Sequence, residues 1–134
     1  MAERHAAGVL DTCTYIGLGL LDPAKLPEIP ELTAITFAEL HQGVAMAKDA
    51  ATRAARTEKL GAAIVEFEPL PFDGPAATRF GTFMALTLDA NRNLKPRRSE
   101  LMIAAIASAR DLPLYTRNAK VFAGLDSMVE IIEV

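Results

Sequence analysis

Four oxygen-bearing side chains stand where predicted strands end or a predicted helix begins: Asp11, Glu39, Glu100 and Asn118. Asp11 follows a short apolar strand, Glu39 lies at the junction of a second strand and a helix, and Asn118 comes after a later strand. In an open α/β sheet, the carboxyl ends of the strands point into the ligand-binding crevice. One crevice can therefore receive all four side chains. Their oxygens suit a hard divalent cation such as Mg²⁺ or Mn²⁺.

Each of these residues also has a purely structural explanation. Asp11, or Thr12 after it, can cap the following helix, and the Thr-x-x-Glu spacing that ends at Glu39 is that of a capping box. Glu100 is a favourable carboxylate in the first turn of a helix, and Asn118 is a common turn residue. Only the joint pattern favours a metal site, where a cation makes bound water more acidic and neutralises charge on a phosphodiester.

Other chemistries fit this sequence less well. It has no Gly-rich phosphate loop and no Gly-x-Ser-x-Gly elbow. His5 and His41 are far apart and have no cysteine companions, which argues against a zinc site. Cys13 is the only cysteine, so an internal disulfide is impossible, and we expect a small core residue in a reducing cytoplasm.

Composition indicates one globular domain over residues 1–134. The chain is 51% hydrophobic and 23% charged, which is enough apolar material for one sizeable core. No apolar run is long enough to span a membrane, and the first seven residues lack the apolar region of a signal peptide. A formal net charge of −3 means that any contact with nucleic acid must come from a local basic patch.

Apolar periodicity and breaker residues predict alternating strands and helices, and hence a parallel α/β sheet covered by helices on both faces. The expected strands are 8–11, 32–36, 65–70, 114–116 and 128–134. The expected helices are 14–21, 37–46, 50–65, about 75–89, with Asp73 as a possible cap, and 99–110, with a turn or short helix over 118–122.

Four segments in this order resemble the PIN-domain ribonucleases, specifically the VapC toxins of bacterial toxin–antitoxin pairs. They are Val-Leu-Asp-Thr at 9–12, Ile-Thr-Phe-Ala-Glu-Leu-His-Gln-Gly at 35–43, Glu-Leu-Met-Ile-Ala-Ala at 100–105 and Leu-Pro-Leu-Tyr-Thr-Arg-Asn at 112–118. Each segment is a weak signal alone, but their order and spacing together are fairly specific. The resemblance covers residues 9–134.

The resemblance implies a PIN-domain-like α/β/α sandwich with a central parallel sheet. It also implies a Mg²⁺- or Mn²⁺-dependent endoribonuclease, a homodimer and inhibition by a small cognate antitoxin. Carried over by position, Asp11, Glu39 and Glu100 would hold the metal, with Asn118 completing the catalytic set. The family usually has Asp where this chain has Glu100, and often has a further Asp where this chain has Asn118.

Two further groups of residues are candidates for binding. Near the acids, Arg97, Arg98, Thr116 and Arg117 can contact RNA phosphates, or the arginines can simply be solvated counter-ions. The antitoxin is expected to bind apolar surface near the first two predicted helices. Tyr15, Ile16, Leu20 and Leu21 crowd a short segment there and can form a groove for an antitoxin helix, or can be ordinary core or dimer contacts.

Two alternatives to a toxin remain open at the level of the sequence. One is a PIN-domain nuclease that matures RNA and has no antitoxin. The other is a degenerate PIN fold that only binds RNA or a protein partner, which Asn118 favours because an amide replaces a carboxylate. Metal-dependent cleavage by the purified protein distinguishes the degenerate fold from the enzymes.

Overall fold

A four-stranded parallel sheet lies at the centre of the computed structural model, which describes residues 5–134, and its strand order is β2-β1-β3-β4. The strands are β1 (Ala7–Leu10), β2 (Ile29–Glu31), β3 (Leu114–Thr116) and β4 (Ile131–Glu133). The helices are α1 (Thr12–Ile16), α2 (Ala34–Ala45), α3 (Ala50–Glu66), α4 (Gly74–Asp89) and α5 (Arg98–Ala109). Short 3-10 turns cover Leu18–Leu20, Pro23–Lys25, Lys95–Arg97 and Ala119–Phe122.

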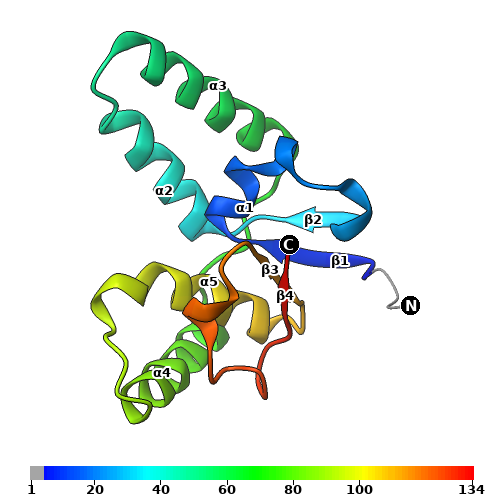
Figure 1. Ribbon diagram of the computed structural model, residues 1–134, viewed down its shortest axis with the longest axis vertical. Helices are drawn as coiled ribbons and strands as arrows, with labels where there is room; N and C mark the ends of the chain where they lie inside the picture. Colours follow the sequence, from blue (N-terminus) through cyan, green and yellow to red (C-terminus); the bar gives the residue numbers. More distant parts are fainter. Residues whose placement is uncertain (1–4) are drawn as a thin grey trace.

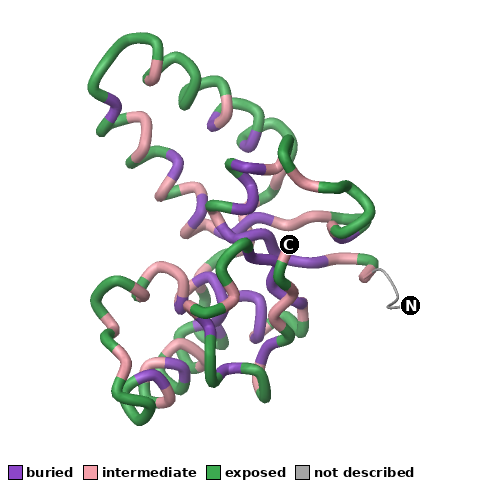
Figure 2. Tube along the Cα trace, viewed as in Figure 1, coloured by how far each residue is buried: buried purple, intermediate pink, exposed green. Residues whose placement is uncertain are grey.

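Helices cover both faces of the sheet, as predicted. Figure 1 shows α1, α2 and α3 on one side and α4 and α5 on the other. Alternation along the strands divides the core, since Val9 and Leu114 pack with α4 and α5 while Leu10 and Tyr115 pack with α1, α2 and α3. Burial is concentrated along β1, β3 and α5, while much of α3 is exposed (Figure 2).

The segment predicted as a strand over 32–36 is different in the structure. Thr33 caps α2, because its Oγ1 accepts a hydrogen bond from the Thr36 backbone N–H at 3.2 Å, and the helix therefore begins at Ala34. The strand instead comes from Ile29–Glu31, a proline-containing segment in which no strand was expected. Pro30 is tolerated there because β2 is an edge strand and Ile29 N–H already donates inward to Ala6.

Two other boundaries were also wrong. Residues 65–70 form no strand: α3 continues to Glu66, and only an isolated bridge joins Leu70 to Thr33. The first helix stops early, since Gly17 is its C-cap and a 3-10 turn follows. The predicted helix after Asp73 is confirmed, with the Asp73 side chain accepting from Ala76 N–H at 3.1 Å. Within residues 5–134, no helix is both long and apolar enough to cross a bilayer.

A close approach between Gly8 and the Tyr115 ring provides a test of the fold. A β-carbon on Gly8 would overlap the ring and lie 3.3 Å from the Pro27 β-carbon, and Tyr115 is too deeply buried to move aside easily. Gly8→Ala should therefore lower the free energy of unfolding by about 1–3 kcal/mol, measured by urea denaturation. Gly81→Ala in α4 is the control: its β-carbon meets nothing within 4 Å, and it should gain up to about 1 kcal/mol. Equal stabilities would refute this packing.

Candidate functional site

Asp11 is fixed in place at the carboxyl end of β1. Its Oδ1 accepts a hydrogen bond from Thr14 N–H at 2.9 Å, and its Oδ2 accepts one from Thr116 Oγ1 at 2.6 Å. The side chain thus caps α1, as the structural explanation predicted, and it also joins β1 to β3. The strand order reverses between β1 and β3, which is where open α/β sheets bind ligands.

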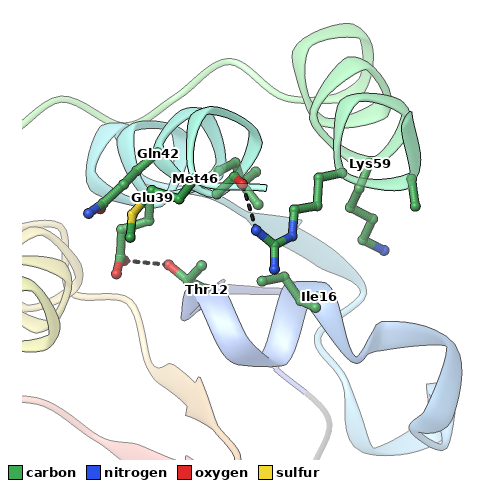
Figure 3. Close-up of a pocket in the computed structure, with 10 residues that line it drawn as sticks. Thr12, Ile16, Glu39, Gln42, Met46 and Lys59 are labelled. Atoms are coloured by element: carbon green, nitrogen blue, oxygen red, sulfur yellow. Dashed lines mark hydrogen bonds between the residues drawn. The ribbon is translucent and has the colours of Figure 1, made fainter. Parts of the chain in front are cut away.

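Glu39 approaches the same crevice from α2. Thr12 Oγ1 donates to Glu39 Oε1 at 2.7 Å and lies 3.0 Å from Thr36 Oγ1, so the start of α1 is tied to α2 (Figure 3). The predicted capping box is wrong because Thr36 lies inside the helix that Thr33 caps. This leaves Glu39 as a partly buried carboxylate on the second turn rather than a capping group.

The charges of three acids interact in this crevice. Burial raises the pKa of Glu39 above its ordinary value, the hydrogen bond from Thr12 opposes this shift, and the charges of Glu100 and Asp11 raise it further. Glu100 lies in the first turn of α5, and its charge acts on Glu39. The charges of Glu100 and Asp11 thus act on Glu39, while the convergence of the acids and Asn118 on one cation stays a prediction.

Cys13, which we expected in the core, is instead exposed beside these acids. Partial burial of the thiol and the charges of Asp11, Glu39 and Glu100 raise the pKa of Cys13, while Arg117 lowers it. Arg117 is thus a cation at the rim of the acid crevice. Its neighbour Asn118 is exposed, and the Asn118 backbone N–H donates to Thr116 Oγ1 at 3.0 Å.

A hard divalent cation fits the donor chemistry of this crevice, because three carboxylates supply oxygen ligands and mutual repulsion that a cation would relieve. The carboxylates are not, however, arranged as a preformed metal site. Within residues 5–134, no three His, Cys, Asp or Glu side chains converge closely enough to hold a metal ion. Binding would thus require movement of at least one carboxylate.

Two residues predicted to contact ligands are core residues. Thr116 is fully buried and binds Asp11, so it positions an acid rather than contacting RNA. Tyr15 is also buried: it packs edge-on against Phe67, and its hydroxyl donates to the Lys59 carbonyl at 3.3 Å. It cannot form part of a docking surface.

The other predicted binding residues are more accessible. Ile16 is 57% exposed and Leu20 is 81% exposed, while Leu21 is partly buried. Arg98 is exposed at the start of α5. Arg97 donates from Nη1 to the Asn93 carbonyl at 2.6 Å, and its buried Nε has no hydrogen-bond partner.

A groove of about 730 Å³ runs between α1, α2 and α3 beside the acids. Ile16 and Met46 supply apolar surface and Arg56 donates to the Gly43 carbonyl at 2.7 Å, while Glu39 closes one end of the groove (Figure 3). The docking residues named from the sequence lie only on the α1 side of this groove. The role of Thr12 as the partner of Glu39 was not predicted, although Thr12 belongs to the Val-Leu-Asp-Thr segment.

Comparison with known proteins gives consistent relatives, although no protein-family model matches the chain. Ribonuclease VapC5 of Mycobacterium tuberculosis is 37% identical over 139 aligned positions that cover both chains completely. The crystal structure of the toxin–antitoxin system VapBC-5 from the same species matches with a TM-score of 0.85, covering 96% of this chain and 99% of that one. FitAcB from Neisseria gonorrhoeae matches at 27% identity and a TM-score of 0.71, covering 93% and 96%.

The raised pKa of Glu39 predicts how charge removal changes stability. In the metal-free protein at pH 7, Glu39→Gln should raise the unfolding temperature by a few degrees, because glutamine still accepts from Thr12 and carries no charge. The pKa of Glu39 in the folded protein lies above its ordinary value of 4.5. The stability of wild type therefore falls as the pH rises from 4.5 through the pKa of the folded protein. The difference between variant and wild type should therefore shrink towards zero near pH 4.

The measurement is thermal unfolding in the presence of a chelator at pH 7 and pH 4. Glu58→Gln, at an exposed position on α3, is the matched control and should change little at either pH. A Glu39→Gln protein that is less stable than wild type at pH 7 would contradict the electrostatic account.

Proposed function

The chain belongs to the VapC family of PIN-domain ribonucleases, and from this premise we propose that residues 1–134 form one domain, the cytoplasmic toxin of a type II toxin–antitoxin pair. Its activity is cleavage of RNA phosphodiester bonds with Mg²⁺ or Mn²⁺. The observation that carries this proposal is the electrostatic interaction of Asp11, Glu39 and Glu100 at the carboxyl edge of the sheet. Like charges kept together in a partly buried crevice favour a function over a purely structural role.

In this proposal, Asp11, Glu39 and Glu100 hold the cation. When bound, the cation supplies a more acidic water and neutralises charge on the phosphodiester. The chain's own residues do the positioning: Thr116 and Thr14 N–H fix the Asp11 carboxylate, and Thr12 fixes that of Glu39. The exposed amide of Asn118 can donate to a phosphate or a water but adds no charge.

Arg97, Arg98 and Arg117 supply the local positive charge that an acidic chain needs to bind RNA. Arg98 and Arg117 are exposed, whereas Arg97 is partly buried and already donates to the Asn93 carbonyl. Single-stranded RNA is recognised largely through phosphate contacts and accessible bases, so a short row of cations beside the acids suits such a substrate. The degenerate PIN fold that only binds RNA is less well supported than an enzyme, because RNA binding alone does not require three acids that repel one another.

Asp11→Asn tests the catalytic proposal. Asparagine has the same shape: its Oδ1 can still accept from Thr14 N–H, and its amide can donate to Thr116 Oγ1, so the fold should persist. Loss of the ligand charge should lower RNA cleavage by about 100-fold or more. The assay is cleavage of a mixed RNA pool with Mg²⁺ or Mn²⁺, together with calorimetric Mn²⁺ titration.

The matched control for that experiment is Asp73→Asn. Asp73 caps α4 through the same type of hydrogen bond to a backbone N–H, but on the opposite side of the sheet. It should cleave like wild type. If Asp11→Asn also cleaves like wild type with the same metal dependence, Asp11 has only its capping role and the site assignment is wrong.

We also propose that the antitoxin occupies the groove between α1, α2 and α3. The groove has exposed apolar walls in Ile16 and Met46 and ends at Glu39, so an amphipathic helix bound there would block the acids. Leu20 and Leu21 extend the apolar surface beyond α1. The homodimer implied by the family would require a different surface, and Ile64 and Val65 on α3 provide exposed apolar area for one.

Ile16→Ser tests the groove. Loss of an apolar contact of about 1–3 kcal/mol should raise the dissociation constant of the cognate antitoxin by about 5–150-fold, measured by calorimetry with the co-purified and separated partner. Leu88→Ser is the control, because Leu88 is equally exposed, at 56%, but lies on α4 across the sheet. Equal affinities for the two variants would place the antitoxin elsewhere.

A further inference from the structure

Arg117 and Gly17 approach each other closely at the rim of the acid crevice. Arg117 directly follows β3, and Gly17 is the C-cap of α1. A β-carbon built on Gly17 would overlap Nη1 of Arg117 and lie 3.4 Å from its Cζ. The guanidinium therefore rests in the space that a side chain at position 17 would fill.

Backbone conformation does not explain why glycine is at this position. Gly17 has φ −90° and ψ 14°, which any residue can adopt. Gly17 is buried, and the Arg117 guanidinium supplies the two atoms nearest to a β-carbon built there. The third is the Cys13 carbonyl oxygen, at an ordinary van der Waals distance of 3.4 Å. The absence of a β-carbon thus affects the placement of the arginine rather than the turn.

The Arg117 guanidinium is available for binding a ligand. Its side chain is exposed, and it makes no hydrogen bond or ion pair with the residues that the structure describes. Arg117 directly follows Thr116, whose hydroxyl holds the Asp11 carboxylate, so this cation leaves β3 beside the acid crevice and is free to bind an anion that reaches it.

We infer that Gly17 is a positioning residue that seats the Arg117 guanidinium at the crevice, where it binds a phosphate of single-stranded RNA. This inference deepens the proposed function and rests on it. Three consecutive residues at the carboxyl end of β3 then serve the site. Thr116 fixes Asp11, and Arg117 and Asn118 face the substrate. A planar guanidinium that is held in place loses less entropy when it binds a phosphate than a mobile one.

The test is the substitution Gly17→Ala with Gly19→Ala as its matched control. Both glycines lie in the same turn after α1, and a β-carbon at Gly19 meets nothing within 4 Å. Because the atom in conflict at Gly17 is the far end of a flexible side chain, Gly17→Ala should displace Arg117 without unfolding the protein. Unfolding temperatures of the two variants should therefore agree closely.

The binding probe is a short fluorescent oligouridine in metal-free buffer, where cleavage cannot occur, titrated at several salt concentrations. Arg117→Gln should weaken binding and reduce the slope of log K against log salt by about 0.7, the value for one phosphate contact on a single strand. Gly17→Ala should weaken binding by about threefold to tenfold, which is part of the same effect. Gly19→Ala should bind like wild type.

A double-mutant cycle separates positioning from any other effect. In the Arg117→Gln background, Gly17→Ala should have no further effect on binding, because the residue that it displaces is absent. The inference is overturned if Gly17→Ala binds like Gly19→Ala, or if its effect persists in that background. If the Gly17→Ala result overturns the inference but wild type cleaves RNA, the proposed function still stands. If wild type neither binds nor cleaves RNA, the proposed function and this inference are both overturned.

Discussion

The hydrogen bond between Thr116 Oγ1 and Asp11 Oδ2 is the contact on which the site depends. It joins residues that are 105 positions apart, at the point where the order of the parallel strands reverses. Both partners are buried, so the bond is protected from competing water. Because Asp11 also caps α1, one carboxylate sets the end of β1, the start of α1 and the spacing to β3. The acid crevice is therefore built on the sheet itself rather than on a loop, which holds its geometry rigidly.

The fold keeps negatively charged side chains together at the carboxyl edge of the sheet, and its hydrogen bonds and positive charges offset their repulsion only in part. Thr12 supports Glu39 with a hydrogen bond, yet burial and the neighbouring acids still favour the protonated form. The nearby positive charge comes from Arg117, which touches none of the acids through an ion pair in the described structure. An arrangement of this kind is less stable alone than with a bound cation or phosphate, as is common at functional sites. The same few acids thus lower the stability of the unliganded protein and provide its proposed binding site.

The sequence predicted the parts of the structure that depend on local pattern. The short apolar run before Asp11, the long apolar helix behind Glu100 and the Asp73 cap each have a strong local signal, and the sandwich follows from their alternation. The rest depends on contacts between distant segments. Thr116 was placed at a surface, and Tyr15 was left open between a docking surface and the core, because a three-residue strand and a five-residue helix are too short to show which side is buried. The start of α2 was missed because β-branched residues favour strands locally, while the Thr33 cap decides the matter. The groove needed α1, α2 and α3 together, so no single segment could reveal it.

Pro30 in the edge strand β2 has a consequence for how this molecule meets other chains. Since Ile29 donates inward to Ala6, the next backbone nitrogen faces outward, and a proline at that position has no N–H to offer. A foreign strand therefore finds no donor there to start a ladder. This protects the edge from fibril-like association with other copies. It also leaves helical grooves and side chains, rather than main-chain ladders, as the means of recognition on this side of the molecule.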